Sequence, residues 1–467
     1  MEIKQYYLGC LSHASYMVTD QATRSAIVVD PQRDVDEYLQ DAAAMGVTIK
    51  EVVLTHFHAD FVSGHLELQK RTGAPISLGE KARAEYDFVP RREGDVITCG
   101  NTRLEVLETP GHTSEAISLV AYEGDVPKAV LTGDTLFAGD VGRPDLAVSE
   151  GIPPEELAGQ LFDSLHGKLM RLPDDTLVYP AHGPGSLCGS GSTSGRSSTI
   201  GRERAENPML QPADKATFVR AISQDLPELP PYFARDARLN RSERADLGDT
   251  VRDANVPLSF AKVLELQQAG AQVLDARMPD DFAEHHLKNA VNVGLDGRFA
   301  QFAGSLLDPE RPLVVIAPVG REVETITRLG RVGFENVAGY LEGGACFVPP
   351  EHRSSQARTS PQQLAEQLAG PEPPFVLDVR SNEEWRSAHL EGARHIPLTE
   401  LNQRLDEIPA EQPVVVHCAS GYRSSMAASV LALHGRACVT DLMGGIAAWQ
   451  QAGLPVVRPQ ADSAAST

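Results

Sequence analysis

The sequence has few basic residues for its length, and this shortage excludes whole classes of partner. It carries 42 basic against 64 acidic residues over 467 positions, which gives a formal net charge of −22. Such an excess of acid disfavours a nucleic-acid backbone or an anionic membrane surface as the main partner. We therefore expect neither nucleic acid nor a membrane among its partners.

Paired cysteines and long hydrophobic runs are also missing. The six cysteines lie far apart, without a CxxC pair or a disulfide-dense stretch, so we expect free thiols in a reducing compartment. Nowhere do about 18 apolar residues follow one another, and the opening MEIKQYYLGC lacks a basic segment followed by an apolar run. These features predict a cytoplasmic protein.

The chain is too long for one hydrophobic core. For 467 residues, a prior of about 150 residues per domain predicts roughly three domains. From residue 3 to about residue 178, short β-rich runs alternate with helical patterns such as VDEYLQDAAAMG, which predicts an α/β layer structure. Each apolar run ends in a polar cluster, and strand ends are where such folds place their chemistry.

The C-terminal part contains an internal repeat. QVLDARMPDDFAEHHLKNAVNVGL at 272–295 matches FVLDVRSNEEWRSAHLEGARHIPL at 375–398, an offset of 103 residues. A duplication of this length predicts two copies of one small domain, not a solenoid. The order of helix, strand, loop, strand and helix in each copy predicts parallel sheets wrapped by helices.

Histidine and aspartate recur at the ends of four apolar runs in the N-terminal part, in the clusters THFHAD, TPGHT, TGDT and YPAHG. One buried histidine is more often a hydrogen-bonded core residue than a ligand, but recurrence at four strand ends predicts a metal site. The candidate ligands are His56, His58, Asp60, His112, Asp134 and His182.

These elements resemble the metallo-β-lactamase superfamily over roughly residues 1 to 245, and the resemblance implies an αββα sandwich. The first motif of that superfamily reads HxHxDH, but this sequence has Phe61 at its last position. Phenylalanine has no lone pair to donate, so a second metal position loses a ligand. His56, His112 and Asp134 remain, a set that suits one metal and fits either a non-haem Fe(II) facial triad or zinc.

Within the superfamily, the sequence is most similar to persulfide dioxygenases, which look like glyoxalase II but use a single iron. The resemblance implies that the three remaining residues bind mononuclear Fe(II), with zinc as the other metal that the ligands permit. It also implies that His58, Asp60 and His182 orient the ligands or the substrate. Direct ligation of a second ion by these three is the alternative.

Two further residues near these motifs are candidate substrate contacts. Arg143 stands in GDVGRPD, where it could hold an anionic thiol carrier or form a surface salt bridge. Cys188 follows His182 by six residues, inside the small and polar segment SLCGSGSTSGRSS at 186–198, which predicts a flexible loop or a loop that folds around a ligand. Cys188 is either a persulfide relay or substrate contact near the metal, or an exposed loop thiol without a role.

A second kind of site is predicted around Cys418. The segment HCASGYRSS at 417–425 follows the apolar run PVVV and precedes a helical pattern, so backbone N–H groups and a helix N-terminus face the thiol. Across 358–458 the sequence resembles a rhodanese, whose cysteine carries sulfur as a persulfide. The resemblance implies that the loop residues Ala419, Ser420, Gly421, Tyr422 and Arg423 bind this persulfide.

Two alternatives to sulfur transfer at Cys418 are a dual-specificity phosphatase and a structural buried thiol. The arginine of such phosphatases lies six residues after the cysteine, whereas Arg423 lies five after Cys418, and the shorter loop favours a sulfur atom over a phosphate. In the first copy Pro318 occupies the place of the cysteine in IAPVGRE, and proline has neither a thiol nor an N–H. That copy is therefore interpreted as a spacer or docking surface.

The remaining thiols lack a comparable setting. Cys346 lies in a different part of the first copy and cannot replace the missing nucleophile. Three further cysteines are interpreted as structural, because most isolated thiols are small buried hydrophobes. They are Cys10, Cys99 and Cys438.

Together these features predict a persulfide dioxygenase and sulfurtransferase that acts in hydrogen sulfide detoxification. The expected domains are residues 1–250, 256–350 and 358–460. The expected partners are a low-molecular-weight thiol persulfide (of glutathione, coenzyme A or another thiol), O₂ and sulfite, with thiosulfate as product, and we expect a homo-oligomer. Two alternatives stay open: a zinc-dependent, glyoxalase II-like thioester hydrolase, and a non-enzymatic sulfur-carrier or docking platform.

Overall fold

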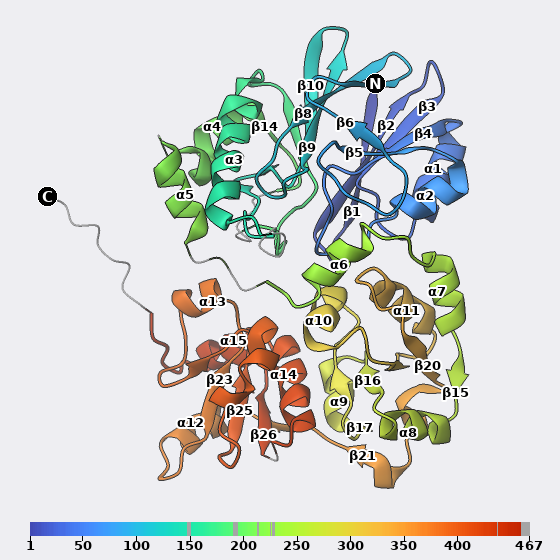
Figure 1. Cartoon of the computed structure of the whole chain (residues 1–467). Helices are drawn as coiled ribbons and strands as arrows, with labels where there is room; N and C mark the ends of the chain where they lie inside the picture. The colour runs from blue at the N-terminus through green and yellow to red at the C-terminus, as the bar shows by residue number, and fades with distance from the viewer. Residues whose placement is uncertain are drawn as a thin grey trace, which may run out of the picture. The chain divides into compact units, whose positions relative to one another are not determined.

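The computed structural model describes residues 1–146, 151–189, 195–212, 214–224, 226, 229–436 and 438–458. The chain divides into two compact units, Met1–Thr250 with Gly330–Gly333, and Val251–Leu329 with Phe334–Thr467 (Figure 1). Both copies of the internal repeat fall in the second unit. Residues 190–194 of the predicted flexible loop, and residues 459 and 460 of the predicted third domain, lie outside the described residues.

Among its described residues, the first unit contains two six-stranded sheets, with strand orders β1-β2-β3-β4-β5-β6 and β14-β13-β10-β9-β8-β7. The strands of the first sheet are β1 (Glu2–Leu8), β2 (His13–Asp20), β3 (Ser25–Val29), β4 (Thr48–Val53), β5 (Ile76–Gly79) and β6 (Val89–Arg91). Those of the second are β7 (Val96–Cys99), β8 (Thr102–Glu108), β9 (Ile117–Glu123), β10 (Val126–Gly133), β13 (Leu177–Pro180) and β14 (Ser198–Thr199).

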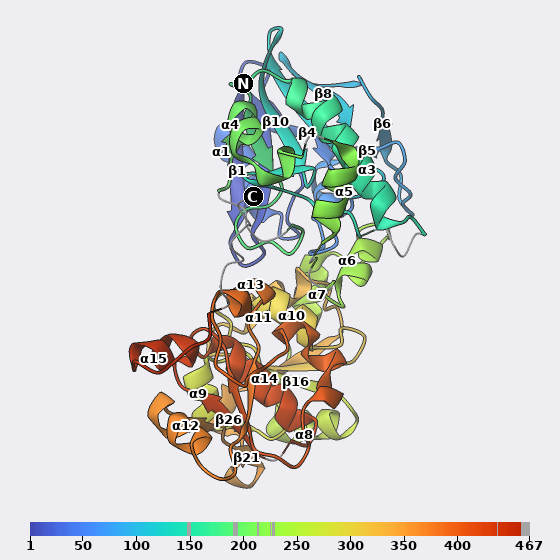
Figure 2. The ribbon, with the colours of Figure 1, turned by 90° about the vertical axis from the view of Figure 1, so that its left-hand side faces the viewer.

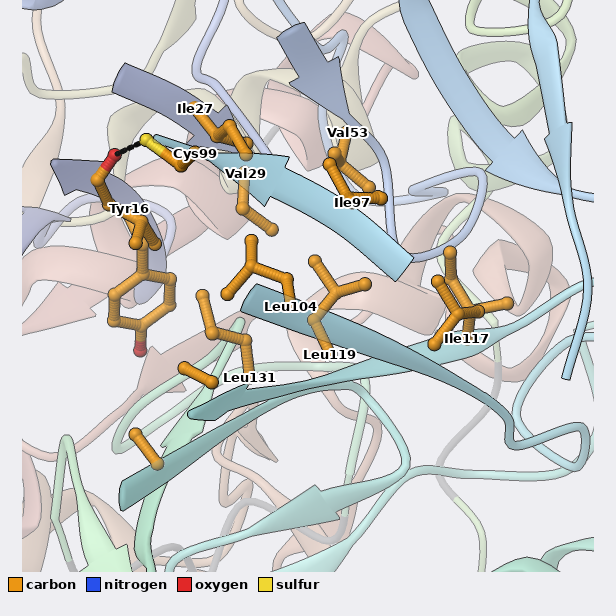
Figure 3. Close-up of a cluster of buried hydrophobic side chains, with 14 of the residues drawn as sticks. Tyr16, Ile27, Val29, Val53, Ile97, Cys99, Leu104, Ile117, Leu119 and Leu131 are labelled. Carbon is orange, nitrogen blue, oxygen red and sulfur yellow. Dashed lines mark hydrogen bonds between the residues drawn. The ribbon is translucent and has the colours of Figure 1, made fainter. Parts of the chain in front are cut away.

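The two sheets of this unit face each other across a hydrophobic core. Strand β8 alternates buried and partly exposed residues along Thr102–Val106, the period of a strand with one buried face. Its Leu104 packs in one cluster with Ile27 and Val29 of the opposite sheet (Figure 3). The sheets are therefore joined by interdigitated side chains, as in a sandwich.

Helices cover the outer faces of this sandwich. Helix α3 (Pro154–Gly167) and helix α5 (Lys215–Ser223) lie side by side (Figure 1 and Figure 2) and share a buried cluster with strands β9 and β10. Helix α1 (Asp36–Met45) shares another buried cluster with β3 and β4. The αββα sandwich predicted from the resemblance is confirmed. The other helices here are α2 (His65–Thr72), α4 (Ile200–Glu206) and α6 (Phe233–Leu239), and the chain passes from the first unit to the second within α7 (Leu247–Ala254).

The part of the second unit that the structure describes contains two five-stranded sheets of the same topology, β15-β20-β19-β16-β18 and β22-β26-β25-β23-β24. All neighbouring strands in both sheets are parallel, which confirms the predicted parallel sheets. The strands are β15 (Pro257–Leu258), β16 (Gln272–Asp275), β18 (Val291–Asn292), β19 (Leu313–Ile316), β20 (Val337–Leu341), β22 (Ala357–Thr359), β23 (Phe375–Asp378), β24 (Arg394–His395), β25 (Val414–His417) and β26 (Val439–Leu442).

Each sheet of the second unit is wrapped by helices, as Figure 1 shows. They are α8 (Phe260–Gln268), α9 (Pro279–Glu284), α10 (Phe299–Leu306) and α11 (Glu322–Gly330) in the first copy, and α12 (Pro361–Leu368), α13 (Asn382–Ser387), α14 (Tyr422–Leu433) and α15 (Gly445–Gln451) in the second. Across the described residues of both units, every helix falls short of the length and apolar character needed to span a bilayer.

Candidate functional site

The candidate metal ligands lie in loops that follow strands of both sheets in the first unit. His56 follows β4, His112 follows β8, Asp134 follows β10 and His182 follows β13. Because β10 and β13 are parallel neighbours, their carboxyl ends meet at one edge and bring Asp134 beside His182. The fold therefore brings together residues that are far apart in the sequence.

Three of these residues converge on one point. Ligand atoms of His56, His112 and Asp134 lie within 4.8 Å of one another. Asp134 Oδ2 is 3.7 Å from His56 Nε2 and 3.3 Å from His112 Nε2. Both Nε2 atoms are buried and have no hydrogen-bond partner among the described residues, a costly state for a polar atom unless a ligand satisfies it.

Hydrogen bonds at the far side of each ring fix which nitrogen carries the proton. His112 Nδ1 lies 2.8 Å from the carbonyl oxygen of Arg143, so Nδ1 donates and Nε2 keeps its lone pair. His56 Nδ1 lies 2.9 Å from Thr55 Oγ1, and that hydroxyl donates its own hydrogen to Asp30. His56 Nδ1 must therefore be the donor as well, and two imidazole lone pairs with one carboxylate oxygen fit a metal ion.

His182 lies between two carboxylates. Its Nδ1 is 2.7 Å from Asp134 Oδ1, and its Nε2 is 2.8 Å from Asp60 Oδ2. Burial lowers the pKa of His182, but Asp134 and Asp60 together raise it well above its ordinary value. Only the Nδ1 contact with Asp134 is a hydrogen bond, because Nε2 and both Asp60 oxygens have no hydrogen-bond partner among the described residues. His182 therefore holds Asp134 in place and lies close to Asp60.

His58 and Phe61 fill the space beside these residues. His58 Nε2 lies 3.1 Å from Asp30 Oδ1. The Phe61 ring is almost fully buried, with its centroid 4.5 Å from that of His58 and 4.0 Å from that of His13. An apolar ring therefore occupies the position where a sixth motif histidine would offer nitrogen to a second ion.

Sequence reasoning missed three buried residues near the site. Asn240 donates to the carbonyls of His58 and Phe61 and accepts from Ser63 N, each at 2.8 Å. These bonds fix the loop after β4 that carries the first candidate ligands. His13 Nε2 and Tyr232 Oη are buried without a hydrogen-bond partner among the described residues. None of the three belongs to a motif, and only the fold brings them to the loop.

The structure changes the setting of both candidate substrate contacts. Arg143 makes a bidentate ion pair with Asp145, at 2.6 and 2.8 Å, and is 1% exposed, so the alternative of a surface salt bridge was wrong about its burial. Cys188 is also 1% exposed, which excludes the exposed loop thiol. Its ligand atom lies within 4.8 Å of those of Asp60 and His182, and burial with the nearby carboxylates raises the pKa of the thiol well above its ordinary value.

The cysteine loop of the second unit has a different geometry. Cys418 directly follows β25 and is 1% exposed. Gly421 N donates to Cys418 Sγ at 3.1 Å, and Ser424 Oγ lies 3.5 Å from the same sulfur. Gly421 has a φ of 108° and caps α14, a backbone conformation that glycine adopts without strain. The loop thus brings an N–H and a helix N-terminus to the thiol, as the sequence predicts.

Two loop side chains point away from the sulfur to partners elsewhere. Arg423 makes a bidentate ion pair with Glu384 of α13, at 2.6 and 2.7 Å. Burial alone would raise the pKa of Glu384, but the ion pair with Arg423 and the hydrogen bonds with Ser381 have the larger effect and lower this pKa to about 2. The Tyr422 hydroxyl bonds to backbone carbonyls of the first copy. Arg423 is therefore a fixed cation beside the loop, and Tyr422 contributes only backbone to it.

The first copy lacks the thiol, but Pro318 does not occupy the cysteine's place. Strand β19 ends at Ile316 and β25 ends at His417. In the sheets, Ile316 pairs with Asp275 of β16, and His417 pairs with the matching Asp378 of β23. The residue that follows β19 is Ala317, which is therefore the counterpart of Cys418. The offset here is 101 residues instead of 103, because the first copy is two residues longer between the repeated motifs.

Gly142 packs against the ligand residues and tests their assignment. A Cβ at this position would lie 2.0 Å from Asp134 O and 2.9 Å from His112 Nδ1. We expect Gly142→Ala to displace these residues and to weaken metal binding about tenfold to a hundredfold, measured by metal titration. Gly167→Ala is the matched control, because a Cβ there meets no atom within 4 Å. Equal affinities in the two variants would contradict the assigned site.

The buried carboxyl group of Asp441 on β26 should make the stability of the second copy depend on pH. It pairs in the sheet with Val416 of β25 and is 1% exposed. Burial raises its pKa from 3.8 to about 6, and Ser424 and Arg358 only partly oppose this. A raised folded-state pKa gives a stabilising contribution that is complete below pH 3.8 and is lost as the pH rises through 6.

We therefore expect Asp441→Asn to stabilise the second copy at pH 8, by at most about 3 kcal/mol, and to have little effect below pH 3.8. Trp385 and Trp449 are the two tryptophans of the chain, so their fluorescence during thermal unfolding of the full chain reports on this copy. Asp406→Asn, at an exposed position, is the control. A stabilisation that is equal at both pH values would be inconsistent with a buried, charged Asp441.

Comparisons with known proteins agree with this architecture. The family model described as metallo-beta-lactamase superfamily matches residues 8–182. The model of the rhodanese-like domain matches residues 259–345 and 360–452.

Individual relatives match parts of the chain of different length. A hydroxyacylglutathione hydrolase of Bradyrhizobium sp. (strain ORS 278) is 33% identical over 241 residues, which cover 51% of this chain and 85% of that protein. A solved metallo-beta-lactamase from Staphylococcus aureus subsp. aureus COL is 29% identical, with a TM-score of 0.64, over 73% of this chain and 98% of its own. ETHE1 from Myxococcus xanthus is 33% identical over 51% and 96%, with a TM-score of 0.44. The chain belongs to the metallo-β-lactamase superfamily, and two rhodanese-like domains follow its N-terminal domain.

Proposed function

We propose that the chain is an iron-dependent persulfide dioxygenase that also transfers persulfide sulfur through Cys418. The observation that carries the proposal is the convergence of two unpartnered imidazole nitrogens on one carboxylate oxygen, beside an aromatic ring in place of a further ligand. Two histidines and one carboxylate are the ligands of non-haem Fe(II) sites with open positions.

His56, His112 and Asp134 would hold the metal. When bound, Fe(II) would supply the redox chemistry by which O₂ takes four electrons from the outer sulfur of a thiol persulfide; water gives the third oxygen atom, the S–S bond breaks, and sulfite and the carrier thiol leave. The protein's own part is orientation: His182 Nδ1 contacts both oxygens of Asp134, at 2.7 and 3.0 Å, and keeps Oδ2 turned toward the two histidines. All three ligands are at most 2% exposed, so the ligand set lies in a buried site.

Arg143 and Cys188 complete the substrate side of this site. The carbonyl of Arg143 accepts a hydrogen bond from His112, and its N–H donates to the carbonyl of Cys188 at 2.9 Å. The Arg143 backbone thus connects a metal ligand with a buried thiol. We assign Cys188 as a contact of the persulfide, because its sulfur lies close to Asp60 and His182.

Sulfur transfer at Cys418 needs no metal. The thiolate attacks the outer sulfur of a thiol persulfide, the original S–S bond breaks, and the carrier leaves as a thiolate with its electron pair. Sulfite then attacks the outer sulfur of the Cys418 persulfide, thiosulfate leaves, and the electron pair returns to Cys418. Gly421 N–H stabilises the anionic sulfur in both steps. Because the metal site produces the sulfite that Cys418 consumes, the fusion joins two reactions that share substrates.

A zinc-dependent thioester hydrolase is the second candidate. It is favoured by the relatives named hydroxyacylglutathione hydrolase and by a second group, Asp60, His182 and Cys188, whose geometry permits another ion. Two metals that activate water would then suffice. His182 Nδ1 bonds to Asp134, but its Nε2 and the Asp60 oxygens have no hydrogen-bond partner among the described residues, so this group stays open to an ion. The Phe61 ring, which packs on His58 in place of a sixth motif histidine, supports the dioxygenase instead. A non-enzymatic carrier platform would not need the converging ligands.

The test is O₂ uptake and thiosulfate formation by the full chain, reconstituted with Fe(II) and supplied with glutathione persulfide. We expect the wild type to consume O₂ and form thiosulfate. Cys418→Ser should keep O₂ uptake but lose most thiosulfate formation, and His112→Ala should lose O₂ uptake by at least about a hundredfold. Hydrolysis of a glutathione thioester by the zinc-loaded chain, without O₂ uptake on the persulfide, would refute the dioxygenase. Equal thiosulfate yields from the wild type and Cys418→Ser would refute the role of Cys418.

A further inference from the structure

Helix α14 begins directly after the cysteine loop and carries a row of hydroxyl side chains. Tyr422, Ser425 and Ser429 are spaced three and four residues apart, so they lie on one side of the helix. Ser425 and Ser429 are almost fully buried. Buried hydroxyls require hydrogen-bond partners, because their desolvation is otherwise uncompensated.

Tyr422 finds its partners in the first copy, on the segment after β18. Its Oη lies 2.5 Å from the carbonyl oxygens of both Gly294 and Asp296. The Phe302 ring packs edge-on against it at 6.0 Å between centroids. A Cβ at Gly294 would lie 2.9 Å from Tyr422 Cε2, so the Tyr422 ring packs tightly against this glycine. Burial raises the pKa of Tyr422, and its hydroxyl therefore stays a donor.

The two serines are bound to Asn292, the last residue of β18. Ser425 Oγ donates to Asn292 Oδ1 at 2.8 Å, and Asn292 N donates to Ser429 Oγ at 2.9 Å. The amide of Asn292 donates in turn to the carbonyls of Asp275 and Arg277, at 3.0 and 2.9 Å. Four hydrogen bonds within the second unit thus fix Asn292, and α14 contacts a residue that is itself held in place.

This contact reaches the reactive sulfur through one peptide unit. Gly421 N donates to Cys418 Sγ, and Tyr422 is the next residue in the chain. No side chain of the loop caps the N-terminus of α14, so the first turn depends on contacts from outside it. We propose that Tyr422 is a positioning residue for sulfur transfer, and that residues 292–297 of the first copy, which has no counterpart of Cys418, hold it in place. The proposal rests on the assigned role of Cys418.

The first copy, although it has no counterpart of Cys418, then has a defined task. It does not bind sulfur itself, because Ala317 stands where a nucleophile would be needed. Its β18 segment instead fixes the direction of the N–H that stabilises the anionic sulfur on Cys418. A misplacement of such a donor affects the reacting state more than the binding of substrate.

The experiment measures sulfur transfer by the full chain, with thiosulfate as donor and cyanide as acceptor, so that the metal site takes no part. The variants are Tyr422→Phe, which removes only the hydroxyl, and Gly294→Ala, which pushes the ring from the other copy. We expect each to lower kcat about fivefold to tenfold and to change KM for thiosulfate less than about twofold. Tyr340→Phe, a phenol of β20 that takes no part in this network, is the matched control.

Fluorescence of Trp385 and Trp449 monitors folding of the second copy in each variant. Unchanged kcat in both variants would overturn the proposal, and so would a loss of kcat that appears only together with loss of the cooperative thermal transition. Cys418→Ser in the same assay separates the two claims. If that variant still turns over, the assigned role of Cys418 has failed; if it is inactive while both positioning variants match Tyr340→Phe, only the present proposal has failed.

Discussion

The metal site depends on how the Asp134 carboxylate is held. Its Oδ2 faces the unpartnered nitrogens of His56 and His112, and His182 Nδ1 contacts both oxygens, Oδ1 at 2.7 Å and Oδ2 at 3.0 Å. Without His182 the carboxylate could rotate away from the two histidines. A partner that fixes a ligating carboxylate keeps the whole ligand set in place.

The motifs at strand ends, through their resemblance to the metallo-β-lactamase superfamily, were enough to predict the fold and the neighbourhood of the site. The polar clusters after β4, β8, β10 and β13 predicted a metal site, and the repeat predicted two parallel sheets. Burial could not be predicted: Arg143 and Cys188 were weighed as surface residues, and both are 1% exposed. Whether a loop residue is covered depends on chain segments distant in sequence, and a local pattern contains no information about these.

Residues that belong to no sequence motif could not be predicted either. Asn240 fixes the loop after β4 from the end of α6, about 180 positions away in the chain. Tyr422 was interpreted as part of the persulfide loop, although its side chain serves the contact with the first copy. The assignment of Pro318 to the cysteine's place was wrong, because a length difference of two residues between the copies shifts the alignment and only the strand ends reveal it.

The most direct test of the account is the number of metal ions that one chain binds. The full-length wild type and Phe61→His would be loaded anaerobically with excess Fe(II), freed of unbound metal and measured by elemental mass spectrometry. The account predicts a single ion in the wild type, and a second ion only where histidine replaces the ring that packs on His58 and His13. Two tightly held ions in the wild type would contradict it.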